Sequence, residues 1–73
     1  ITKTIFLGPV IFAAANFDEP LDLQVCIFRD NVNFLGCRFA GGAGFAGVTF
    51  EGQADLRNTY FGGQASFLSA QFS

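Results

Sequence analysis

Large apolar side chains recur along this chain at a fixed interval of eleven residues. One series contains Phe28, Phe39 and Phe50, and a second, interleaved series contains Phe34, Phe45 and Leu56. A small or medium residue stands two positions before each large one, as Val32 does before Phe34. Residues two apart on an extended backbone share a face, whereas their neighbours point the other way. The pattern therefore predicts short extended segments that each direct one small and one large side chain inward.

The two series divide the chain into units of alternately five and six residues. Counting each repeat from its phased Phe as position one, the extra residue falls near positions three and four. These positions are occupied by Gly8-Pro9, Glu19-Pro20, Asp30-Asn31, Gly41-Gly42, Gly52-Gln53 and Gly63-Gln64. Gly tolerates positive φ and Pro presets a turn, so we expect a corner at each pair. Gly and Pro at such regular intervals would break a helix.

A chain that turns every five or six residues, with one large apolar side chain inward per segment, is typical of a β-solenoid. Successive coils stack at about 4.8 Å, so that backbone groups pair from coil to coil and like side chains lie above like. The sequence thus predicts an all-β fold without helices.

Three units carry a resemblance to a known family. Residues 43–47 (AGFAG), 54–58 (ADLRN) and 65–69 (ASFLS) resemble pentapeptide-repeat proteins, whose consensus is Ala-(Asp/Asn)-Leu/Phe-x-x. Asp55 supplies the polar residue of that consensus, and the phase extends over residues 1–73 because Ile1 keeps step with Leu23. The alternating sixth residue is a departure that resembles the Phe-rich, eleven-residue branch of the family.

The resemblance implies a right-handed quadrilateral β-helix with four units, about 22 residues, in each coil and three and a half coils in all. On two opposite faces the expected core stacks are Phe6, Phe28, Phe50 and Phe72, and Phe17, Phe39 and Phe61. The other two faces would stack Phe12, Phe34 and Leu56, and Ile1, Leu23, Phe45 and Phe67. We expect Phe28 to lie on Phe50 and across the core from Phe39.

A narrower solenoid that closes in eleven residues is the competing arrangement, and the two cysteines distinguish the models. Cys26 and Cys37 would be neighbours in the narrow coil, within the 4.4–6.8 Å Cα separation of a disulfide. In the wide coil they face each other across the core as buried small hydrophobes. We favour the wide coil, because an eleven-residue ring has little room for two inward Phe side chains.

Composition argues against most chemistry. The net charge is −2, with only Lys3, Arg29, Arg38 and Arg57 as cations, so the chain has no basic footprint and we expect no direct nucleic-acid partner. It contains no His and two Cys, which predicts no metal site and no disulfide framework. We find no nucleophile with a paired base, so we expect no enzyme activity, no catalytic residues and no cofactor.

The acidic and glycine-rich stretches have ordinary explanations. Asp18, Glu19 and Asp22 are too few to enclose Ca²⁺ and are expected on a solvated surface, as are the other acids. Residues 41–47 superficially resemble a phosphate loop, but no Lys-Ser/Thr pair or helix follows. We expect these glycines at a corner and on a slim face.

The apolar residues 5–15 contain Gly8 and Pro9 and are far shorter than the roughly 20 residues of a spanning helix. No basic region precedes them, so we expect no membrane insertion by this segment and, by default, a cytoplasmic location. The chain lacks an initiator Met, and we expect residues 1–73 to be one solenoid segment of a longer protein. Open solenoid ends expose apolar surface and free edges, which would allow self-association.

Outward aliphatic residues provide the candidate interface. Ile5, Leu7 and Ile27 are predicted to project from one face of the first two coils, and Ile11 and Leu35 from the adjoining face. A contiguous apolar group marks a possible docking site. The first hypothesis is therefore a non-catalytic structural module that docks onto another protein or subunit. Substitution of Ile27 or Leu35 by Asp is expected to leave folding intact.

The second hypothesis comes from the resemblance. Some pentapeptide-repeat proteins look like duplex DNA in size and charge and bind type II topoisomerases. That role needs long acidic columns, whereas Arg29, Arg38 and Arg57 interrupt the acids here. Three and a half coils would also make a rod only about 17 Å long.

Overall fold

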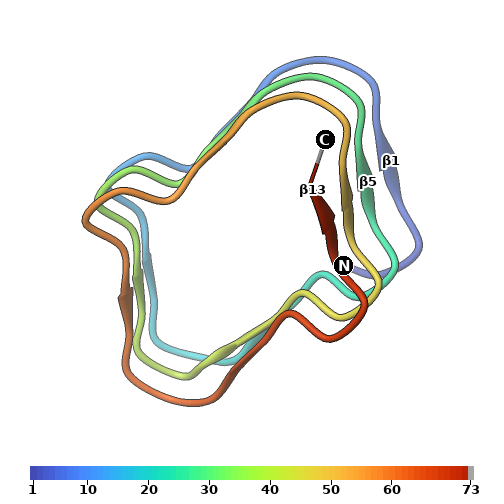
Figure 1. Cartoon of the computed structure of the whole chain (residues 1–73). Helices are drawn as coiled ribbons and strands as arrows, with labels where there is room; N and C mark the ends of the chain where they lie inside the picture. Colours follow the sequence, from blue (N-terminus) through green and yellow to red (C-terminus); the bar gives the residue numbers. More distant parts are fainter. Residues whose placement is uncertain (73) are drawn as a thin grey trace.

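The computed structural model describes residues 1–72 and consists of short parallel strands wound into a four-sided coil (Figure 1). Every strand has two residues. In chain order they are β1 (Ile5–Phe6), β2 (Val10–Ile11), β3 (Asn16–Phe17), β4 (Leu21–Asp22), β5 (Ile27–Phe28), β6 (Val32–Asn33), β7 (Arg38–Phe39), β8 (Ala43–Gly44), β9 (Thr49–Phe50), β10 (Ala54–Asp55), β11 (Tyr60–Phe61), β12 (Ala65–Ser66) and β13 (Gln71–Phe72).

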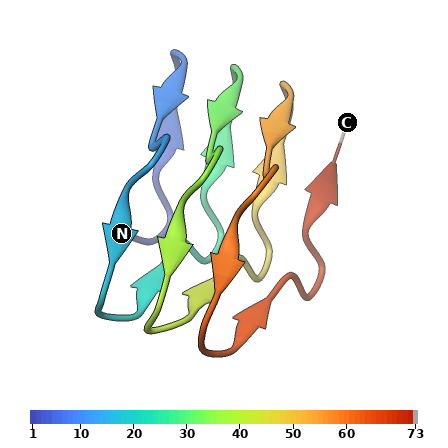
Figure 2. The same ribbon diagram turned by 90° about the vertical axis from the view of Figure 1, so that its left-hand side faces the viewer.

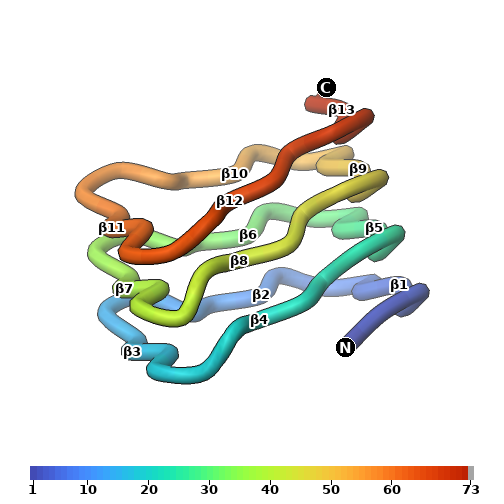
Figure 3. Tube along the Cα trace, turned by 90° about the horizontal axis from the view of Figure 1, so that it is seen from below, coloured from blue at the N-terminus to red at the C-terminus, as the bar shows by residue number. Residues whose placement is uncertain are grey.

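Four parallel sheets form the sides of the coil. We call them face A (β1-β5-β9-β13), face B (β2-β6-β10), face C (β3-β7-β11) and face D (β4-β8-β12). The chain visits A, B, C and D in turn, so A lies opposite C and B opposite D (Figure 1). Figure 3 shows the coils stacked from the N-terminal end to the C-terminal end.

The register of the sheets decides between the wide and the narrow coil. Ile5 pairs with Ile27 and Ile27 with Thr49, a step of 22 residues that every other strand pair repeats. The wide coil of about 22 residues, with about three turns, is therefore confirmed. Cys26 and Cys37 are both buried and free.

Phenylalanine rings fill the coil in columns, one column on each face. On face A, Phe28 stacks on Phe6 and Phe50 with centroid separations of 4.8 and 5.5 Å, and Phe50 on Phe72 at 4.8 Å. Faces C, B and D contain the stacked pairs Phe17–Phe39, Phe39–Phe61, Phe12–Phe34 and Phe45–Phe67, at 4.8–5.3 Å. Parallel stacking at about the spacing of strands therefore continues each column from coil to coil.

The columns touch one another through ring edges. Phe39 meets Phe45 at 6.1 Å with an interplanar angle of 88°, and Phe34 meets Phe45 at 5.7 Å and 84°. Such edge contacts suit the positive rim and negative face of aromatic rings. The middle coil is the best buried part, since Phe28, Phe34, Phe39, Phe45 and Phe50 are at most 1% exposed. Phe72, in contrast, is 56% exposed at the C-terminal coil.

The first residues follow the coil without forming a strand. Ile1 is 66% exposed, although its terminal ammonium donates to the carbonyl of Asp22 at 3.0 Å. Lys3 N–H donates to the carbonyl of Gln24. This stretch therefore lies beneath the segment that joins face D to face A in the next coil.

The corners lie where the sequence predicts them, with a bend or turn at each of the six pairs, but most of their glycines do not have the expected left-handed conformation. Among the glycines at positions three and four, only Gly42 has a positive φ, at 95°. The left-handed residues occur instead at position nine of every repeat: Lys3, Ala14, Val25, Gly36, Gly47, Asn58 and Ser69. The sequence did not predict the left-handed conformation at position nine, because most of these residues are not glycine.

The glycines at position three have a different use. A Cβ atom on Gly41 would lie 2.6 Å from the backbone carbon of Glu19, and one on Gly52 would lie 2.6 Å from that of Asp30. Real Cβ atoms do not approach backbone so closely. These glycines therefore allow one corner to sit close upon the corner of the coil before it.

Candidate functional site

Apolar residues face outward mainly in the first coil. Ile5, Leu7 and Ile11 are 51%, 73% and 74% exposed. The same outward columns become polar in later coils. The column that begins at Ile5 continues with Ile27, Thr49 and Gln71. The column that begins at Ile11 continues with Asn33 and Asp55. The first coil is thus apolar on faces A and B, and the rod becomes polar toward its C-terminal end.

Ile27 and Leu35 are less exposed than the sequence suggested. Both are half-buried. Ile27 lies between Ile5 and Thr49 in its column, so the neighbouring side chains cover part of it. The structure therefore brings Ile5, Leu7 and Ile27 together on face A, with Ile11 around the corner on face B and Leu35 one coil further along. We call these five residues the apolar surface.

Charged residues lie at the margins of this surface. Residues 4–17 contain no charged side chain. Lys3 precedes this stretch. Phe6 and Phe28 are register partners, so the residues that follow them, Leu7 and Arg29, are neighbours in one outward column. Asp30 occupies the next corner and accepts a hydrogen bond from Asn31 N–H at 2.7 Å.

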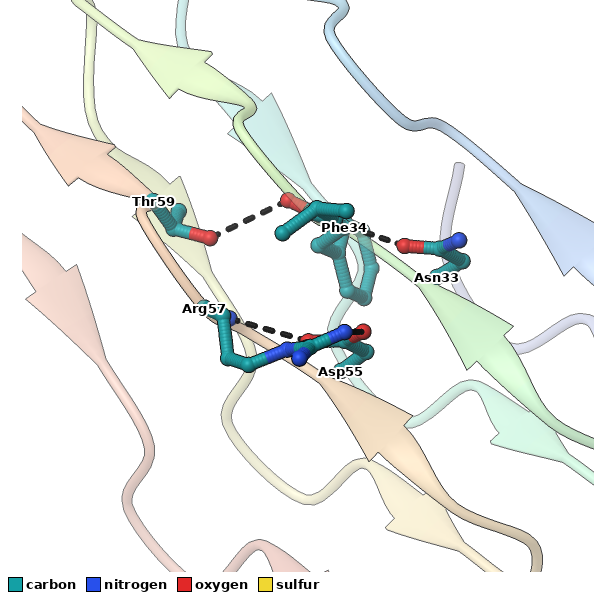
Figure 4. A network of polar contacts seen from close by, with 6 residues as sticks. Asn33, Phe34, Asp55, Arg57 and Thr59 are labelled. Carbon is teal, nitrogen blue, oxygen red and sulfur yellow. Dashed lines mark hydrogen bonds and ion pairs between the residues drawn. The ribbon is translucent and has the colours of Figure 1, made fainter.

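Polar residues at the centre of faces B and D have a structural role. Asn33 Oδ1 accepts a hydrogen bond from Leu35 N–H at 2.8 Å, and Asp55 Oδ1 accepts in the same way from Arg57 N–H (Figure 4). Asp22 Oδ1 accepts the equivalent bond from Gln24 N–H. Ser66 makes the equivalent, longer contact to Leu68 N–H. These side chains cap the turn that follows each strand. The acid at the consensus position of the repeat therefore has a structural role, which is to accept a hydrogen bond from a backbone N–H of the following turn.

Asp55 also forms an ion pair with Arg57, at 2.9 Å between Oδ2 and Nη2. The hydrogen bond from the Arg57 side chain lowers the pKa of Asp55, and the bond from Arg57 N–H and the positive charge lower it further. The same hydrogen bond raises the pKa of Arg57. This is the one ion pair in the described part of the chain, and it lies in solvent, so its contribution to stability is small.

The two cysteines and Thr59 bind the coil beneath them through side-chain hydrogen bonds. Cys37 Sγ donates to the carbonyl of Phe12 at 2.9 Å, and Thr59 Oγ1 donates to that of Phe34 at 3.1 Å (Figure 4). Cys26 Sγ makes the corresponding, longer contact to the Ile1 carbonyl at 3.5 Å. Each acceptor stands 25 residues earlier. The two thiols are therefore buried in the core and make the same type of hydrogen bond as the Thr59 hydroxyl.

The acidic residues do not line up along the rod. Asp22 lies beneath Gly44 and Ser66, and Asp55 lies above Asn33. Glu19 and Asp30 are followed by Gly41 and Gly52 at their corners. Residues 1–72 therefore contain no acidic column, and the DNA-mimic hypothesis gains no supporting observation.

Within residues 1–72, no three side chains of His, Cys, Asp or Glu come together in a group that could hold a metal ion. None of these residues forms an apolar helix of the length that spanning a membrane requires. The glycine-rich residues 41–47 form a corner and strand β8 of face D.

One pair of exposed side chains was missed by the sequence analysis. Arg38 lies on face C directly beneath Tyr60, with its guanidinium 4.5 Å from the ring centroid. The sequence does contain one sign of this pair, because Arg38 and Tyr60 occupy the same repeat position 22 residues apart and so lie in one column. Contact between the two side chains also depends on rotamers, which the periodic pattern does not specify.

Comparison with known proteins agrees with this geometry. The family model described as pentapeptide repeats (9 copies) matches residues 1–49. Neither the curated proteins nor the solved structures gave a match. The matched region is more than half of the 73 residues, and the same coil continues beyond it through β10, β11, β12 and β13. The chain therefore belongs to the pentapeptide-repeat family.

Proposed function

We propose that this solenoid is a non-catalytic structural module that binds another protein or subunit through its apolar surface. The observation that supports the proposal is the concentration of exposed aliphatic side chains in the first coil, with Leu7 and Ile11 each more than 70% exposed. Single exposed aliphatic residues are ordinary, but a contiguous group on a rigid surface is typical of a docking site. The charges that border it leave its centre neutral.

The rigidity of the coil favours binding. Each residue of the surface sits on or beside a strand that pairs with the next coil, and Phe6 and Phe28 fix these strands from inside. A preorganised backbone loses little conformational freedom when a partner binds. Burying one aliphatic side chain contributes about 1.5–3 kcal/mol, so two anchors suffice to change Kd by more than tenfold.

The lack of a catalytic role is part of the proposal. The chain contains no His, and the acids that could serve as bases on faces B and D, Asp22 and Asp55, already accept backbone hydrogen bonds. The proposal includes self-association through the edges of the sheets. Within residues 1–72, each sheet has two edge strands that pair on one side only: β1, β2, β3 and β4 at one end of the solenoid, and β10, β11, β12 and β13 at the other. These edges offer backbone pairing positions for a second copy of the chain.

The test removes the apolar surface without touching the core. Ile27 and Leu35 are half-buried, so Leu7→Asp and Ile11→Asp are the better substitutions. The matched control is Leu68→Asp, because Leu68 is 74% exposed but lies near face D in the third coil. Circular dichroism should show the same fold for the wild type, the Leu7→Asp, Ile11→Asp double variant and the Leu68→Asp control.

Affinity capture from a lysate of the source organism, read out by mass spectrometry, then compares the variants. We expect at least one protein that the wild type and Leu68→Asp retain and that the Leu7→Asp, Ile11→Asp double variant loses. Retention of the same proteins by the double variant would refute the proposal.

A further inference from the structure

Face C carries an ordered pair of exposed side chains that the apolar surface does not include. Arg38 on β7 and Tyr60 on β11 are register partners, and the guanidinium carbon lies 4.5 Å from the centroid of the Tyr60 ring. This distance is within the range of a cation–π contact, about 6 Å. The side view in Figure 2 presents these strands side by side. Tyr60 is nevertheless 50% exposed, so much of the pair remains open to solvent.

The Tyr60 ring lies over Gly62. A Cβ atom on Gly62 would lie 2.8 Å from Cε2 of Tyr60, closer than real Cβ contacts allow. The ring therefore leans over the bare backbone of Gly62 rather than projecting straight into solvent. The ring thus lies near both that backbone and the Arg38 side chain, and it offers an aromatic surface behind the guanidinium.

Arg38 has no anionic partner within the described residues. The one ion pair found there joins Arg57 to Asp55. Asn16 lies beneath Arg38 in the same column, and Tyr60 lies above it. Asp18, one coil lower on face C, is the acid nearest in the sequence pattern, and it makes no ion pair with Arg38 within 4.0 Å. The N–H groups of the Arg38 guanidinium therefore remain available to a binding partner.

We propose that Arg38 and Tyr60 form a recognition site for a carboxylate side chain of a partner protein. The planar guanidinium matches a carboxylate with two parallel hydrogen bonds, and an aromatic face on one side orients it and excludes water. Arg and Tyr are also the residues that most often dominate binding energy at interfaces. Because the contact between Arg38 and Tyr60 is present in the unbound chain, binding a carboxylate loses less conformational entropy than ordering a free arginine would.

This site is separate from the apolar surface. Face C lies opposite face A, where Ile5, Leu7 and Ile27 are found (Figure 1). The two surfaces therefore make independent contacts, and the carboxylate site stands whether or not the apolar surface binds a protein.

The test uses two short peptides and the whole chain labelled with ¹⁵N. Ac-Gly-Glu-Glu-Gly-NH₂ is the probe, and Ac-Gly-Gln-Gln-Gly-NH₂ is the uncharged control of the same shape. We expect the Glu peptide to shift the Arg38 Nε–H signal and the amides of residues 38–40 and 60–62, with Kd in about the millimolar range. The Gln peptide should bind about tenfold more weakly.

Variants separate the site from general attraction between charges. Arg38→Gln should weaken binding of the Glu peptide about tenfold, and Arg38→Lys should weaken it severalfold because a point charge cannot form the two parallel bonds. Tyr60→Phe should keep the affinity, whereas Tyr60→Leu should lower it. Arg29→Gln removes an exposed arginine on face A and should have no effect.

Three results would overturn the proposal. They are the absence of any shift at about 10 mM Glu peptide, equal binding of the Gln peptide, and an equal loss of affinity in Arg29→Gln and Arg38→Gln. Tighter binding of inorganic phosphate than of the Glu peptide would also overturn the assignment to a carboxylate.

Discussion

A left-handed backbone conformation occurs at position nine of each eleven-residue repeat, and it causes strain where that residue is not glycine. Five residues other than glycine have φ between 54° and 62°, a region where Cβ crowds the following carbonyl oxygen. Val25 is the most strained of them, because its side chain branches at Cβ. The neighbouring repeats place Gly36, Gly47 and Asn58 at the equivalent position, which are residues that accept this conformation.

Replacing Val25 by Asn should therefore stabilise the fold. Asn tolerates a positive φ, and the Val25 side chain is 53% exposed, so little packing is lost. We expect the free energy of unfolding to rise by about 0.5–1 kcal/mol, measured by urea denaturation. Thr49→Asn is the matched control, since Thr49 is also β-branched but lies on strand β9 outside the positive-φ residues. It should be neutral or destabilising, and the reverse order of the two variants would contradict this explanation.

At the scale of the strand and corner, sequence periodicity predicted which residues point inward but not how the corners are built. The large residue of each unit is at the same repeat position throughout, so its inward direction followed from counting. The corner conformation did not, because Ala14, Val25 and Ser69 give no local sign of a left-handed turn. The half-burial of Ile27 and Leu35 was missed for a related reason, since it depends on the size of side chains in adjacent coils.

The close stacking of corners gives a prediction with an internal control. Gly8, Asp30 and Gly52 occupy the same position in successive coils. Gly52→Ala would place Cβ 2.6 Å from the Asp30 backbone, whereas nothing lies within 4 Å of a Cβ on Gly8. Neither glycine has a positive φ. The clash should cost about 1–3 kcal/mol in Gly52→Ala, and Gly8→Ala should be close to neutral.

Thermal unfolding followed by circular dichroism would measure both glycine variants. Equal melting temperatures for Gly8→Ala and Gly52→Ala would show that the corners can separate without cost.

At the scale of the whole molecule, the 22-residue coil assembles both the apolar surface and the Arg38–Tyr60 site. It brings Arg38 beneath Tyr60 and Ile27 above Ile5, residues that are distant in sequence but adjacent on one face. The coil could be predicted from the repeat and the family resemblance, and the apolar surface from the outward positions. The Arg38–Tyr60 contact could not, because it depends on the rotamers of the two side chains.

Disulfide formation between outward positions tests the coil most directly. Ile27 and Thr49 are register partners on face A, so the double variant Ile27→Cys, Thr49→Cys should form a disulfide under mild oxidation. Ile27→Cys with Arg38→Cys is the contrasting pair, which would be adjacent only in an eleven-residue coil. Mass spectrometry of the oxidised proteins gives the answer. We predict a cross-link between positions 27 and 49 and none between 27 and 38; the opposite result would contradict the wide coil and the surfaces that depend on it.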